Sequence, residues 1–108
     1  MFSSLLIVND NYLKHLRGKE MLKTYAQNKS PASKGMMTNY FCDTCGTLMY
    51  RVSERFPGHS ILRLGTVDDF NLAETKLKPR TEVYTKDRVS WLPGVLGDDV
   101  RTFEASPA

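Results

Sequence analysis

The stretch FCDTCGTLMYR, residues 41–51, contains both cysteines of the chain. Two residues separate Cys42 from Cys45, Gly46 follows at once, and an apolar run with the character of a β-strand comes next. Two thiolates at this spacing can reach one tetrahedral metal ion from a single turn. A structural zinc ion needs four ligands, so the stretch carries the pattern of half a zinc site.

The residues on either side of the cysteines predict a β-hairpin with the thiols at its tip. Residues 36–41 lead into the turn and residues 48–52 lead out of it as two short strands. A metal-binding turn directs backbone N–H groups at the sulfurs, and Gly46 tolerates the positive φ that this demands. Thr44 and Thr47 are placed to add local side-chain hydrogen bonds.

Three other interpretations of the cysteine pair stay open at this point. A thioredoxin-like redox pair has the same spacing but belongs at a helix N-terminus, whereas both flanks here have strand character. The cysteines could also be ordinary small residues of a hairpin. Finally, His59 or His15, the two histidines of the chain, could supply a third ligand.

The rest of the chain predicts a mainly β fold. Residues 4–8, 22–27, 60–64 and 80–86 are short runs of apolar or alternating side chains with turn residues between them. At most one turn of helix is expected around residues 12–16, a polar loop over residues 28–35, and a turn at residues 56–58. We expect a single domain over residues 1–108, in which residues 98–108 fray.

Composition excludes several classes of function. The chain has 108 residues, of which 41% are hydrophobic and 25% charged, as in ordinary globular proteins. Its net charge of +3 is scattered among acidic residues instead of forming a basic stripe, which argues against a nucleic-acid partner. No apolar run approaches the roughly 18 residues of a membrane helix. With two cysteines and no secretion signal, we expect a reducing, cytoplasmic location.

Several stretches in register resemble one known family. The motif F-C-x-x-C-G-T-L-x-Y-R over residues 41–51 strongly resembles the C-terminal zinc pair of the GFA family, the glutathione-dependent formaldehyde-activating enzymes, and their CENP-V relatives, with the fungal members most similar. The other similar stretches are residues 2–4 (FSS), 6–8 (LIV), 24–25 (TY), 37–40 (MTNY), 56–58 (FPG), 65–69 (GTVDD) and 86–92 (KDRVSWL). The resemblance therefore covers nearly the whole chain.

The resemblance implies a β-tent fold and two zinc sites. In the family, a structural zinc is held by an N-terminal CxC together with the CxxC that matches Cys42 and Cys45. A second, catalytic zinc is held by a CxCxxC that precedes the segment similar to residues 2–4. Neither N-terminal motif occurs here, so we expect an N-terminally truncated domain. Cys42 and Cys45 are carried over as structural zinc ligands, and no catalytic residue is assigned.

The implied chemistry is that of a carbon–sulfur lyase acting on adducts of glutathione, or another small thiol, with an aldehyde. Because the CxCxxC is absent, we expect impaired catalysis, and whether the chain is an enzyme stays open. The alternative is a non-enzymatic interaction or dimerisation module. A homodimer could complete a Cys₄ site. For Trp91 we expect a core or lid packing role, and for Asp68 and Asp69 a capped turn; Arg88 receives no role.

Overall fold

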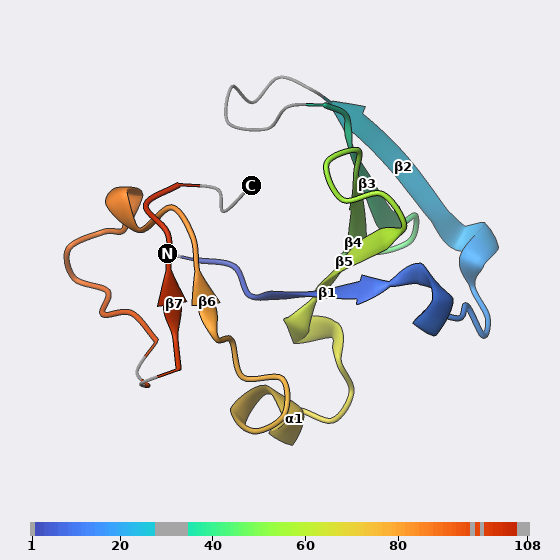
Figure 1. The fold of residues 1–108 in the computed structure, drawn as a ribbon. Helices are drawn as coiled ribbons and strands as arrows, with labels where there is room; N and C mark the ends of the chain where they lie inside the picture. The colour runs from blue at the N-terminus through green and yellow to red at the C-terminus, as the bar shows by residue number, and fades with distance from the viewer. Residues whose placement is uncertain (1, 28–34, 96, 98, 106–108) are drawn as a thin grey trace.

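The computed structural model describes residues 2–27, 35–95, 97 and 99–105. Five antiparallel strands form one sheet in the order β1-β5-β4-β3-β2. The bounds of these strands are Leu5–Asn9 (β1), Leu22–Gln27 (β2), Met37–Cys42 (β3), Leu48–Ser53 (β4) and His59–Arg63 (β5). Figure 1 shows the strands as one twisted layer with β2 along its outer edge. The prediction of a mainly β fold is confirmed.

The C-terminal third forms smaller elements. Strands β6 (Thr81–Glu82) and β7 (Arg101–Thr102) pair in parallel as a separate ribbon, preceded by the single-turn helix α1 (Asn71–Glu74) (Figure 1). The strand predicted over residues 80–86 is therefore wrong beyond its first part. Tyr84 has a left-handed φ of 55°, which ends the extended run, and a 3-10 turn follows over Thr85–Asp87. Within the stretch expected to fray, β7 is an ordered pair with β6.

The connection between β1 and β2 is irregular. A 3-10 turn over Asp10–Tyr12, in which the Asn11 N–H donates to the Asn9 side chain, starts earlier than the helical turn predicted around residues 12–16. A second 3-10 turn, Lys19–Met21, leads into β2. The polar loop predicted over residues 28–35 lies outside the described residues except for Gly35. Within the described part of the chain, no helix has the length and apolar character needed to cross a bilayer.

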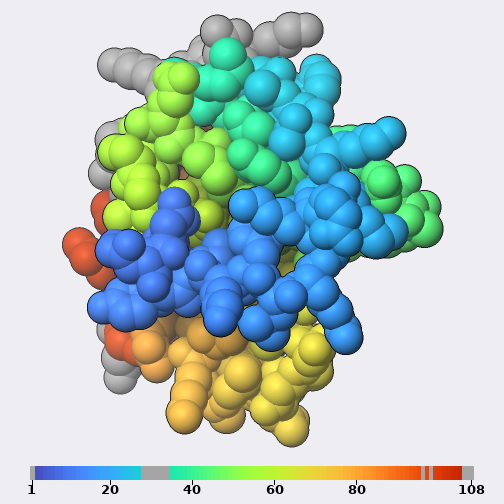
Figure 2. Space-filling view, turned by 90° about the vertical axis from the view of Figure 1, so that its right-hand side faces the viewer, coloured from blue at the N-terminus to red at the C-terminus, as the bar shows by residue number. Residues whose placement is uncertain are grey.

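Long-range hydrogen bonds hold this connection against the sheet. The Asp10 N–H donates to the Gly58 carbonyl at 2.9 Å, and the Ser60 hydroxyl donates to the Asp10 carboxylate at 2.6 Å. Figure 2 shows the first part of the chain, in blue, running across the middle of this face, with the hairpin strands in green above it. The segment between β1 and β2 therefore forms part of the molecular surface beside the sheet.

Register places a row of aromatic and apolar side chains on one face of the sheet. Leu6, Leu62, Tyr50, Tyr40 and Thr24 are consecutive cross-strand partners from β1 to β2, and directly opposed residues share a face. The rings of Tyr40 and Tyr50 stack, with centroids 4.6 Å apart. An irregularity between β3 and β4, where Tyr40 pairs with Tyr50 but Phe41 pairs with Leu48, leaves Met49 as the extra residue.

The hydrophobic core is small for a chain of this length. Tyr50, Ile61 and Leu64 are the buried apolar side chains of the described residues, and none of the described side chains is completely enclosed. The radius of gyration is 14.9 Å, compared with about 13 Å for a compact domain of this length. Much apolar surface is therefore uncovered, including Leu5 and Ile7 of the edge strand β1.

Candidate metal centre

The two cysteines lie at the tip of the predicted hairpin, which the structure confirms. Cys42 is the last residue of β3, and Cys45 lies in the turn before β4. The Cys42 N–H donates to the Thr47 carbonyl at 2.9 Å and closes the hairpin. The Asp43 N–H donates to the Met21 carbonyl at 3.0 Å, so the residue that precedes β2 fixes the turn from the other side.

Gly46 makes the sharp return of the chain possible. Its N–H donates to the Cys42 carbonyl at 2.8 Å, and its φ of 77° lies in the left-handed region. A Cβ at this position would meet no atom within 4 Å, so the need for glycine is conformational and not steric. This agrees with the role that the sequence assigns to the residue.

Groups of the turn itself lie within hydrogen-bonding distance of both sulfurs. The Thr44 N–H donates to Cys42 Sγ at 3.4 Å, and the Thr47 hydroxyl lies 3.1 Å from Cys45 Sγ. The Thr47 hydroxyl, followed by the Thr47 backbone and the neighbouring Cys42 thiol, lowers the pKa of Cys45. The thiolate is the form that ligates metals, and the lowered pKa of Cys45 favours that form. Both cysteines are free, Cys42 half-buried and Cys45 exposed.

The histidines do not complete the site. His15 Nε2 lies 3.0 Å from the Tyr50 hydroxyl, and His59 Nδ1 lies 3.0 Å from the Pro57 carbonyl. Among the described residues, no three His, Cys, Asp or Glu side chains come close enough to hold a metal ion together. The chain thus offers two thiol ligands in a suitable turn, where a structural zinc ion takes four. The redox alternative lacks its usual helix N-terminus, because strands flank both cysteines.

The sequence also predicts roles for Asp68, Asp69 and Trp91, which lie outside the hairpin. The Asp69 carboxylate accepts from the Asn71 N–H at 3.1 Å, a local side-chain bond of the kind expected at this turn, and it lies just before α1. The core role expected for Trp91 is wrong, because 69% of the side chain is exposed, and the lid role stays a prediction.

Arg88, to which the sequence assigns no role, pairs with Glu82. Glu82 also accepts from the Val95 N–H, so this carboxylate connects β6 with the loop that precedes β7. The contact is structural and lies in the C-terminal ribbon, whereas the cysteines lie in the main sheet.

A pocket that the sequence did not reveal adjoins the cysteine turn. It has a volume of about 420 Å³ and is lined by residues of the 13–19 segment, by the start of β2, and by Cys42, Tyr50 and Leu62 of the sheet. No local sequence signal could have identified it, because the segment that forms one wall is irregular and is held in place by contacts distant in sequence. Cys42 therefore belongs both to the candidate metal centre and to a pocket wall.

Comparison with known proteins gives one result. No curated protein and no solved structure matches the chain. A family model described as "Glutathione-dependent formaldehyde-activating enzyme" (GFA) matches residues 1–87, well over half of the sequence, and the cysteine turn lies within the matched region. The chain therefore belongs to the GFA family.

Proposed function

We propose that Cys42 and Cys45 are two of the four ligands of a structural zinc ion in a β-tent domain of the GFA type. The observation that carries the proposal is the hairpin turn itself, in which a backbone N–H donates to Cys42 Sγ, the Thr47 hydroxyl lies beside Cys45 Sγ and Gly46 takes a left-handed conformation. Membership of the GFA family supports zinc as the metal. Free thiols fit a reducing location such as the cytoplasm.

The proposed chemical class is that of the carbon–sulfur lyases, acting on adducts of glutathione or another small thiol with an aldehyde. In such an adduct the thiol sulfur is bonded to the former carbonyl carbon, and the carbonyl oxygen has become a hydroxyl. A metal ion bound at a catalytic site would polarise that oxygen as a Lewis acid. The two cysteines of this chain are both committed to the structural site, and the 108 residues contain no others.

We therefore expect the 108-residue polypeptide alone to have little lyase activity. The protein is first loaded with zinc. Adduct formation from glutathione and formaldehyde is then monitored by NMR. The uncatalysed reaction and a family member that contains a CxCxxC motif serve as the two references. Turnover close to that of this family member would contradict the expectation, because it would require a catalytic site built from other residues.

A second candidate function is an interaction or dimerisation module without catalysis. The uncovered apolar side chains of the edge strand β1, Leu5 and Ile7, together with the exposed Phe2, favour it. In one version of this candidate, Cys42 and Cys45 of two chains form a Cys₄ site on a two-fold axis, which would supply the missing ligands.

Solution mass with and without zinc separates these alternatives. A shared Cys₄ site predicts a monomer in chelator and a dimer in zinc, with one zinc ion for two chains. A dimer that persists in chelator would instead indicate association through the apolar surface of β1. One zinc ion for each chain in a monomeric protein would rule out the shared site.

A further inference from the structure

The pocket beside the cysteine turn has the walls of a small-molecule site. Its volume of about 420 Å³ lies in the range of ligand pockets, roughly 300–1,000 Å³. Most of its wall is apolar and comes from both the 13–22 segment and the sheet. The apolar side chains concerned are Leu13, Leu16, Met21, Leu22, Met49 and Leu62.

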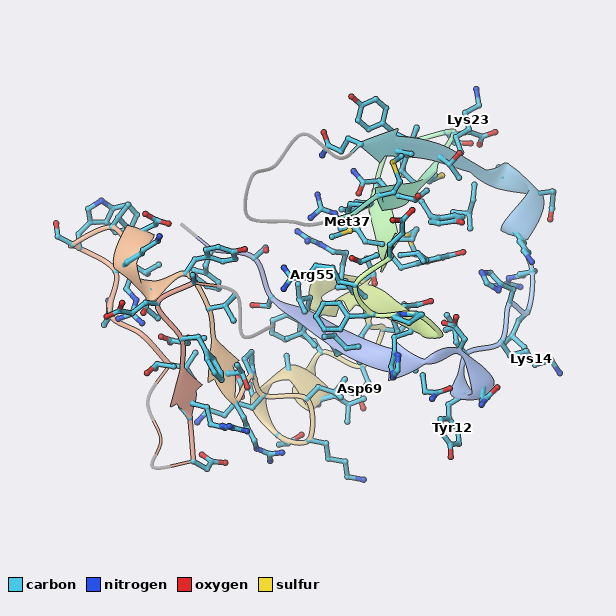
Figure 3. All side chains as sticks on the ribbon, turned by 45° about the horizontal axis from the view of Figure 1, so that its top comes forward. Tyr12, Lys14, Lys23, Met37, Arg55 and Asp69 are labelled. Atoms are coloured by element: carbon cyan, nitrogen blue, oxygen red, sulfur yellow. The ribbon has the colours of Figure 1, made fainter. Side chains whose placement is uncertain are left out.

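The charged residues of this pocket are all basic. Lys14, Arg17 and Lys19 line it, and the described residues that line it include no aspartate or glutamate. All three basic residues are exposed, and Figure 3 shows Lys14 directed away from the sheet. The positive charge therefore lies at the exposed rim, which also carries the exposed Leu16 and Met21, while the more enclosed part of the lining is mostly apolar. Such a combination favours a ligand with an apolar body and an anionic group at its outer end.

A hydrogen-bonded pair supplies the polar group of the wall. His15 Nε2 and the Tyr50 hydroxyl are 3.0 Å apart, and the two rings meet edge to face at 5.7 Å. Stacking on Tyr40 fixes the Tyr50 ring from its other side. Burial, with smaller effects of Tyr40 and Asp10, raises the pKa of Tyr50, so the hydroxyl stays neutral and can both donate and accept.

We propose that this pocket binds a small organic anion, a monocarboxylate with an apolar body of about the size of a fused aromatic ring. The apolar body contacts the leucine and methionine side chains, and the carboxylate faces Arg17 and Lys19 at the rim. Tyr50 and His15 offer hydrogen bonds within the wall. The proposal is independent of zinc, because nothing in it requires an occupied metal site.

The experiment uses three probes of the same shape and different charge: 2-naphthoate, 2-naphthylmethanol and 2-naphthylmethylamine. Each is titrated into the metal-free protein, and binding is followed by calorimetry and by NMR of the backbone amides. We expect 2-naphthoate to bind about fivefold to tenfold more tightly than the alcohol, and the amine to bind least tightly. The shifted amides should be those of residues 13–22, 49, 50 and 62.

Matched variants locate the charge effect. Arg17→Ala with Lys19→Ala should reduce the affinity for 2-naphthoate to that for the alcohol and leave the alcohol unchanged. Lys23→Ala with Lys86→Ala removes the same charge from exposed residues that do not line the pocket and should leave both affinities unchanged. Figure 3 shows Lys23 projecting from β2.

The hydroxyl is tested in the same way. Tyr50→Phe keeps the stacked ring and should weaken 2-naphthoate binding severalfold, whereas Tyr40→Phe should have no effect. Equal affinities for the three probes, amide shifts outside the pocket, or an equal loss in the Lys23 and Lys86 control would each overturn the proposal. Because the titrations are made without metal, such a failure would leave the proposed zinc site untouched.

Discussion

Replacing Cys42 with serine is expected to weaken zinc binding by more than about 100-fold. Removing a residue that only hydrogen-bonds to a metal ligand already lowers metal affinity by about 10–100-fold, and removing the ligand itself lowers it more. Serine keeps the shape of the side chain, but its hydroxyl is not ionised near neutral pH, so the turn would retain a single thiolate. The measurement is competition with a chelator of known zinc affinity, supported by the sulfur-to-metal absorption band of the cobalt-loaded protein.

Two threonines of the same turn provide graded controls. Thr44→Ala keeps the backbone N–H that donates to Cys42 Sγ and should bind zinc as the parent chain does. Thr47→Val removes the hydroxyl beside Cys45 Sγ and should weaken binding by about tenfold. If Cys42→Ser bound zinc as tightly as the parent, Cys42 could not be a ligand and the proposed structural site would be wrong.

Replacing Ile61 with alanine is expected to lower the free energy of unfolding by about 2–4 kcal/mol. Ile61 is 6% exposed and lies in β5, where it pairs with Ile7 of β1 and with Arg51 of β4. Ile61 is one of three buried apolar residues in the described part of the chain, and its loss should lower Tm by roughly 10–20 °C. Chemical denaturation monitored by circular dichroism gives the first quantity, and calorimetry gives the second.

The control is the residue directly opposite in the sheet. Ile7→Ala deletes the same atoms from the cross-strand partner, but Ile7 is 50% exposed, so the loss should stay below about 1 kcal/mol. Equal losses for the two variants would contradict the description of β1 as an uncovered edge. In that case a dependence of the Ile7→Ala effect on protein concentration would identify a second copy as the cover.

The strands of the sheet could be predicted from the sequence because their signals are local. Alternation over residues 22–27 and 60–64, and the glycine turn between residues 41 and 51, placed β2, β5 and the hairpin to within a residue or two. The alternation over residues 80–86 was equally clear and gave only Thr81–Glu82, because no strand of the main sheet lies beside it. An alternating pattern shows that a segment prefers the extended conformation, but a strand forms only where a neighbouring strand is available to pair with it.

The candidate site, too, has a part that could be predicted from the sequence and a part that could not. Spacing placed Cys42 and Cys45 in one hairpin turn and predicted the backbone conformation of Gly46, since such a turn is a local structure. The pocket depends on where the 13–19 segment lies. Contacts distant in sequence hold this part of the chain: Asp10 with Gly58 and Ser60, and His15 with Tyr50. Contacts between residues so far apart cannot be predicted from the local pattern of a single sequence.

Cys42 is shared by the turn and the pocket wall, and this has a thermodynamic consequence. If a metal ion on the sulfur changes the affinity of the pocket for its anion by some factor, the anion changes the affinity for the metal by the same factor. The metal ion would then have more than a structural role in the hairpin. Its retention would depend on the concentration of the anion bound in the pocket.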